Sequence, residues 1–169
     1  MDINEAKKIY EKYNYDSREM SENNAYSELK KYNVSKEIVE QWYQEEYSKR
    51  IMDFKQNFSV EKDNSELVWQ IYRGFCKYID DKGIVVILNQ IFSNVATIQP
   101  NVEINYYMPV LCIIAYDNFT PLLSDRIKKQ AIELIRKRLE LIFEKYIDLQ
   151  QKYQHLYNLC DNKLNNMKL

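Results

Sequence analysis

Three apolar segments in the middle of the chain constrain its fold more than any other feature. They are residues 67–76, 84–92 and 109–116, and few charged side chains interrupt them. Because water disfavours exposed apolar surface, such segments have to be covered on most sides. The flanking segments are charged and amphipathic, so we expect them to form the cover.

The scarcity of glycine and proline indicates which elements enclose those segments. The chain has 2 Gly and 3 Pro among 169 residues, well below the usual ~7% and ~5%. A sheet protein needs both residues for its tight turns, so helices are favoured. A length of 169 residues with 46% hydrophobic and 29% charged residues fits one globular domain.

Apolar residues recur at three- and four-residue steps over most of the chain, which predicts amphipathic helices. We therefore predict an all-α fold, a single-domain irregular bundle of six to eight helices spanning 1–169. Amphipathic helices occupy 1–58, buried central helices occupy 64–118, and a long C-terminal helix occupies 124–164. The expected helices cover 4–13, 25–32, 35–57, 66–81, 84–95, 108–117 and 124–164, with a short capped turn between 14 and 24.

Several local features leave alternatives open. Segments 84–95 and 109–116 are rich in β-branched residues, so strands are the second interpretation of both. Gly83 is expected to be the left-handed residue after a helix end, and 96–105 is expected to be irregular, with a short extended piece at 102–104. Pro109 suits the first turn of its helix. The segment 124–164 is one long helix, or two with a bend near Asp148.

The residues give no basis for a catalytic or metal site. The sequence contains no HExxH, GxxxxGK[ST], GxGxxG or GxSxG motif, and its single histidine is His155. Cys76, Cys112 and Cys160 lie far apart and form no CxxC pair, which indicates free thiols in a reducing compartment. We predict a non-enzymatic cytoplasmic protein without metal or cofactor, and without a secretory signal or membrane-spanning segment.

The N-terminal third combines acidic side chains with an unusual number of tyrosines. Seven of the 15 tyrosines fall within the first 47 residues, and tyrosine is enriched at protein interfaces. We predict that a basic protein partner is bound here by occlusion, with glutamates steering it and aromatic residues anchoring it where they are exposed. By analogy, small acidic helical proteins of this kind include immunity proteins, antitoxins and inhibitors. The predicted partner-binding residues are Glu37, Glu40, Trp42, Tyr43, Glu45, Glu46 and Tyr47.

The C-terminal segment supports two alternatives. Residues 124–169 carry ten basic and six acidic side chains, the only basic part of a chain whose net charge is −1. A nucleic acid is therefore the alternative partner, although interleaved glutamates also fit a solvated helix face. A homodimer formed through the long helix is a further, structural alternative. The candidate nucleic-acid-binding residues are Arg126, Lys129, Arg136, Lys137 and Arg138.

Overall fold

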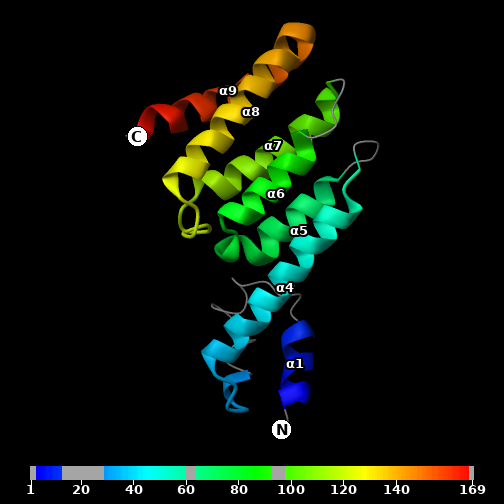
Figure 1. Ribbon diagram of the computed structural model, residues 1–169, viewed down its shortest axis with the longest axis vertical. Helices are drawn as coiled ribbons and strands as arrows, with labels where there is room; N and C mark the ends of the chain where they lie inside the picture. Colours follow the sequence, from blue (N-terminus) through cyan, green and yellow to red (C-terminus); the bar gives the residue numbers. More distant parts are fainter. Residues whose placement is uncertain (1–2, 13–28, 60–63, 93–97, 168–169) are drawn as a thin grey trace.

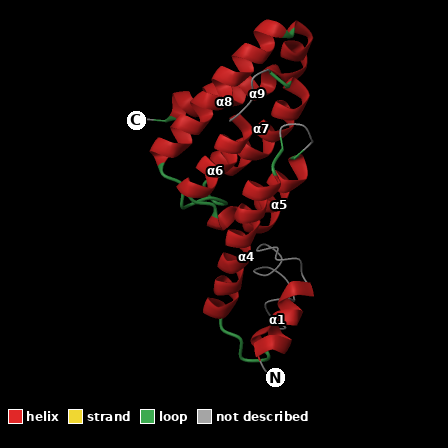
Figure 2. Ribbon diagram, turned by 45° about the vertical axis from the view of Figure 1, so that its right-hand side comes forward, coloured by secondary structure: helices red, strands yellow, loops and turns green. Residues whose placement is uncertain are grey.

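A computed structural model describes residues 3–12, 29–59, 64–92 and 98–167, and within these ranges it contains helices and no strand (Figures 1 and 2). The all-α prediction is therefore confirmed, and the strand alternatives are wrong for 84–92, the described part of 84–95, and for 109–116. The predicted turn at 14–24 and the first half of the helix predicted at 25–32 lie outside the described residues. The elements are α1 (Ile3–Lys12), α4 (Lys36–Asn57), α5 (Ser65–Phe75), the 3-10 helix η1 (Cys76–Tyr78), α6 (Asp81–Phe92), α7 (Pro100–Ala115), α8 (Asp125–Lys145) and α9 (Ile147–Asn166).

Helix α7 lies at the centre of the molecule. It contacts α5 on one side and α8 and α9 on the other, and the Phe92 ring of α6 approaches the Tyr107 ring at 5.9 Å. Its buried positions cover most of the helix circumference and leave one narrow exposed stripe that includes Asn101 and Asn105. The predicted burial of the third apolar segment is thus confirmed.

The N-terminal helices pack through aromatic rings at one end of the molecule (Figure 1). Tyr10 of α1 lies 5.3 Å from the Trp42 ring and 5.2 Å from the Tyr43 ring, both on α4. Lys77 of η1 places its ammonium group 5.2 Å from the Tyr43 ring centre, a favourable cation–π geometry. Ser35 caps α4 as predicted, because its hydroxyl accepts the Ile38 N–H at 3.3 Å.

The segment around Gly83 differs from its prediction. Helix α5 ends at Phe75 rather than at 81, and α6 begins at Asp81, so Gly83 lies in a first helical turn and has no positive φ. Asp80 caps that turn by accepting the Gly83 N–H at 2.8 Å and the Tyr47 hydroxyl at 3.3 Å. A Cβ at Gly83 would lie 2.3 Å from the Tyr47 hydroxyl oxygen. Glycine is needed here for close packing of α6 on α4, and the left-handed turn prediction was wrong.

The two prolines of α7 occupy positions that differ from those expected from the sequence. Pro100 occupies the first turn, so the predicted irregular segment is helical from residue 100, and 102–104 is not extended. Pro109 lies inside the helix and is buried. It removes the hydrogen bond to the carbonyl of Asn105, a residue on the exposed side of α7, where water can hydrate that carbonyl.

The C-terminal segment is a hairpin of two helices, which corrects the prediction of one long helix. Helix α8 ends at Lys145, Tyr146 is non-helical (φ −133°, ψ 84°), and α9 returns along α8. The break falls two residues before the bend predicted at Asp148. Helix α9 has a further kink at Tyr153 (φ −117°, ψ 16°). Ser124 caps α8 as predicted, accepting the Ile127 N–H at 3.3 Å.

The close approach at Gly83 gives a test of the packing of α6 on α4. We expect Gly83→Ala to lower the free energy of unfolding by about 1–2 kcal/mol, because overpacking outweighs the gain in helix propensity. In a Tyr47→Phe background the obstructing oxygen is absent, so the loss should be smaller. Urea denaturation of the four proteins measures both values. A Gly83→Ala protein as stable as the wild type would contradict this packing.

Candidate binding groove at the tip of the C-terminal hairpin

The aromatic part of the predicted α4 surface is in the core. Trp42, Tyr43 and Tyr47 are 7%, 2% and 7% exposed. They occupy the stripe of α4 that faces α1, η1 and α6, because the apolar positions of an amphipathic helix turn toward its neighbours. The sequence predicted that these three residues would anchor a partner where they are exposed. Their burial does not meet that condition, and their rings stabilise the fold instead.

The predicted glutamates of α4 do not form a strongly negative surface. Glu45 lies 3.7 Å from the Lys7 ammonium group, and Glu46 lies 3.6 Å from the Arg50 guanidinium group. Glu37 is exposed and Glu40 is half-buried. Two of the four carboxylates thus have a cation beside them, which weakens the field that would steer a basic partner.

The five candidate nucleic-acid-binding residues are dispersed as well. Arg136 donates to Asp161 of α9 at 2.7 Å, and Arg138 is bound to Glu103 of α7. Arg126 and Lys137 are exposed and Lys129 is half-buried. Their outer helix face also carries the exposed residues Glu133, Glu140 and Glu144. Two of the five cations therefore hold helices together, and the remaining three share their surface with carboxylates that repel phosphate.

Arg138 belongs to a buried polar network that joins α7 to α8. Glu103 is 2% exposed, and its two carboxylate oxygens accept from Arg138 at 3.0 and 2.8 Å. The Tyr107 hydroxyl donates to the same carboxylate at 3.0 Å. Burial, and then the neighbouring Glu103 charge, raise the pKa of Tyr107 well above its ordinary value. A buried carboxylate needs such partners, because removing one leaves an uncompensated charge.

A hollow of about 420 Å³ lies where α7, α8 and α9 meet. The two lysines that line it already make contacts within the protein. Lys128 is buried and paired with Asp117. Lys163 of α9 donates to the carbonyl oxygen of Ala115 at 3.1 Å, a favourable place for a cation at the C-terminal end of α7. These contacts fasten the chain after α7 to its neighbours.

The cysteines and the histidine do not gather at a site. Cys76 and Cys160 are buried, and burial raises the pKa of the Cys160 thiol to about 12. Cys112 is half-buried, and burial raises the pKa of its thiol as well. His155 is exposed, with its ring 6.3 Å from the Tyr153 ring. In the described ranges, no three His, Cys, Asp or Glu side chains group together as metal ligands would.

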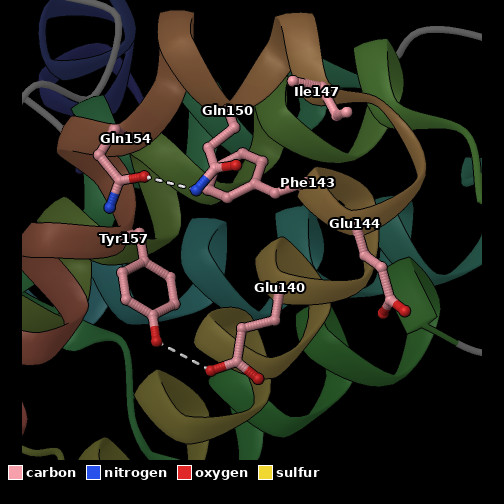
Figure 3. Close-up of a pocket in the computed structure, with 7 residues that line it drawn as sticks. All are labelled: Glu140, Phe143, Glu144, Ile147, Gln150, Gln154 and Tyr157. Carbon is pink, nitrogen blue, oxygen red and sulfur yellow. Dashed lines mark hydrogen bonds between the residues drawn. The ribbon is translucent and has the colours of Figure 1, made fainter.

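The α8–α9 hairpin forms a groove of about 460 Å³ near its tip (Figure 3). This volume lies within the ~300–1,000 Å³ range of ligand pockets. Helix α8 contributes two exposed carboxylates and one buried ring, and α9 contributes two amides, a phenol and the first residue of the helix. The lining residues are Glu140, Phe143, Glu144, Ile147, Gln150, Gln154 and Tyr157.

Hydrogen bonds within the groove connect its polar side chains in pairs. The Tyr157 hydroxyl points toward Glu140 and donates to Oε1 at 2.9 Å (Figure 3). Gln150 Nε2 donates to Gln154 Oε1 at 3.3 Å, and Gln154 Nε2 donates to Asn158 Oδ1 at 3.2 Å. The hydrogen bond to Glu140, more than burial, raises the pKa of Tyr157. These hydrogen bonds fix the polar side chains of the groove relative to their neighbours, although most of its residues lie at the surface.

Apolar side chains are exposed at the hairpin tip, and one of them, Ile147, lines the groove. Ile147, Leu141 and Tyr146 are 69%, 41% and 38% exposed. All three fall within residues 141–147, where α8 ends and α9 begins, at the end of the molecule opposite to α1 (Figure 1). Single exposed apolar residues are ordinary, but an apolar cluster bordered by polar residues marks interaction sites.

The groove was not found from the sequence, because it exists only in the hairpin. On one continuous helix, Glu140 and Tyr157 would lie roughly 25 Å apart at 1.5 Å per residue, whereas the structure joins them by a hydrogen bond. No glycine or proline marks the reversal at Tyr146. The signal in the sequence was the apolar Ile147 immediately before the charged Asp148. Ile147 lies outside the regular spacing of the inward-facing apolar residues.

Comparisons with models of protein families, with curated proteins and with solved structures returned no match to this chain. Across the described residues, no helix combines the length and the apolar character that a bilayer crossing requires. A function for this chain is therefore inferred from the chemistry of its residues and from their geometry.

The role of Arg138 in the fold can be tested against its neighbour. We expect Arg138→Met to lower the free energy of unfolding by about 3 kcal/mol, because the Glu103 carboxylate stays buried without its cation. Lys137→Met, one residue away and exposed, should change it by less than about 0.5 kcal/mol. Thermal and urea denaturation compare the two variants. Equal effects would show that Arg138 is an ordinary surface cation.

Proposed function

We propose that this protein is a non-enzymatic binding module that recognises a basic protein partner through the tip of its α8–α9 hairpin. The observation that carries the proposal is the pairing of exposed apolar side chains with an acidic groove. Ile147, 69% exposed, lies beside Glu140 and Glu144. An apolar contact bordered by carboxylates fits a protein surface of opposite charge.

The location of the groove supports the same partner class. The tip is at a free end of the molecule, so a large partner reaches it without obstruction by the rest of the described chain (Figure 1). The lining of the groove contains two carboxylates and no cation, whereas the exposed cations Lys137 and Lys145 of α8 lie outside the lining, three residues before Glu140 and one after Glu144. The lining itself is therefore negative, although the C-terminal segment as a whole is basic.

The mechanism that follows is occlusion of the partner. The sequence predicted the same mechanism at the surface of α4, whereas the proposed surface is the hairpin tip. The carboxylates attract the partner over a distance of about 8–10 Å in physiological salt. The apolar residues of the tip then lose contact with water, and their burial contributes about 25 cal/mol per Å². Covering the partner's basic surface would block whatever that surface binds.

A second candidate is self-association through α8, the homodimer alternative. Leu134 is 50% and Leu141 41% exposed, and their spacing of seven residues places them on one face of α8. Sedimentation at micromolar concentration separates this candidate from the first. A dimer lost in Leu134→Asp would favour self-association, and a monomer leaves the tip as the binding surface.

The proposed surface is tested with two matched charge reversals. The groove variant combines Glu140→Lys and Glu144→Lys, and the control combines Glu37→Lys and Glu45→Lys on α4. Basic proteins retained by the wild type from a lysate of the host organism are purified and titrated by calorimetry. We expect the groove variant to bind them at least about tenfold more weakly, because like charges would face each other, and the control to bind like the wild type.

Two results would contradict the proposal. If the α4 control loses binding and the groove variant keeps it, the partner surface is on α4. If neither variant changes the affinity, charge on these two surfaces does not recognise the partner. Circular dichroism of both variants confirms that the fold is intact, which is expected because all four glutamates are at least partly exposed.

A further inference from the structure

The groove at the hairpin tip has a surplus of hydrogen-bond acceptors. Each of its donor groups makes one hydrogen bond inside the protein: the Tyr157 hydroxyl donates to Glu140, the Gln150 amide to Gln154, and the Gln154 amide to Asn158. Within the part of the chain that the structure describes, no hydrogen bond or ion pair engages either oxygen of Glu144 or the second oxygen of Glu140, although the Arg136 charge acts on Glu140. A ligand that fits this groove therefore has to bring donors and positive charge.

The spacing of the two carboxylates suits a planar donor better than a point charge. Glu140 and Glu144 are four residues apart on α8, so their Cβ atoms are roughly 6 Å apart on one helix face. A guanidinium group presents five N–H donors in a rigid fork and can contact both carboxylates at once. An ammonium group has three donors on one nitrogen and is more strongly hydrated, so it loses more on leaving water.

The walls of the groove favour the same group. Phe143 and Tyr157 line it with rings whose centroids are 6.5 Å apart, and Ile147 adds an apolar side chain at its mouth. Aromatic surface attracts a guanidinium group by cation–π contact and stacking. The methylene stem of the same side chain lies well against an apolar wall while its head meets the carboxylates.

We propose that the groove receives an arginine side chain of the basic partner. This inference rests on the proposed function, because it specifies which residue of the partner enters the site. The guanidinium group lies between Glu140 and Glu144 against the aromatic rings, and the stem crosses Ile147. The groove thus adds selectivity for arginine over lysine to a general attraction for positive charge.

The test uses two capped amino acids of equal charge, Nα-acetyl-arginine methylamide and Nα-acetyl-lysine methylamide. Each is titrated into the full-length protein labelled with ¹⁵N, and amide shifts are followed. We expect the arginine compound to shift the amides of residues 140–157. Its affinity should be at least about threefold above that of the lysine compound, because one cation–π contact supplies a difference of that size. Glu144→Gln should weaken arginine binding by about threefold, and Glu37→Gln should leave it unchanged.

The outcomes separate this inference from the proposed function. Equal shifts from both compounds at residues 140–157 would overturn the arginine preference and leave an acidic groove for any basic partner. Shifts spread equally over α4 and the tip, or none at either, would overturn the inference, since the groove would then have no affinity for a single cation. The proposed function is decided independently by the charge-reversal variants and the purified partner.

Discussion

Helix α7 is buried over most of its circumference, and the arrangement of the other helices follows from this constraint. Ile104 and Leu111 on one side of the helix, and Tyr106 and Ile113 on the opposite side, are all nearly inaccessible to water. Burying a large apolar side chain stabilises a protein by about 1.5–3 kcal/mol, so α7 can be stable only inside a shell. Helices α5, α6, α8 and α9 provide this shell, and α4 and α1 pack outside it.

The few polar groups of this interior show how the helices are held in register. Glu103 meets Arg138 between α7 and α8, and Asp80 meets Tyr47 and Gly83 between α4 and α6. Hydrogen bonds of this kind contribute little net stability but are unfavourable to break. They therefore select one arrangement among several that would bury the same apolar area. They also explain why cations that look available for binding in the sequence are engaged in the fold.

The class of the fold could be predicted from the sequence because it depends on composition and on local spacing. The features that determine the class act locally. They are the three apolar segments, the helix caps at Ser35 and Ser124, and the low glycine content. The roles of Gly83 and Pro109 depend instead on what lies across from them, a Tyr47 hydroxyl and an exposed carbonyl position. The reversal at Tyr146 is a further tertiary effect, since pairing α9 with α8 buries Leu156 and Cys160. The groove follows from that reversal, so local pattern alone could not reveal it.

The central claim is that α7 is the enclosed core of the molecule and that the hairpin tip is its accessible end. Amide hydrogen exchange measures this difference along the chain. The account predicts that the amides of residues 110–114 exchange only on global unfolding and are the most protected. The amides of residues 147–152, with few buried contacts, should exchange orders of magnitude faster. Equal protection of the two segments, or faster exchange in α7, would contradict it.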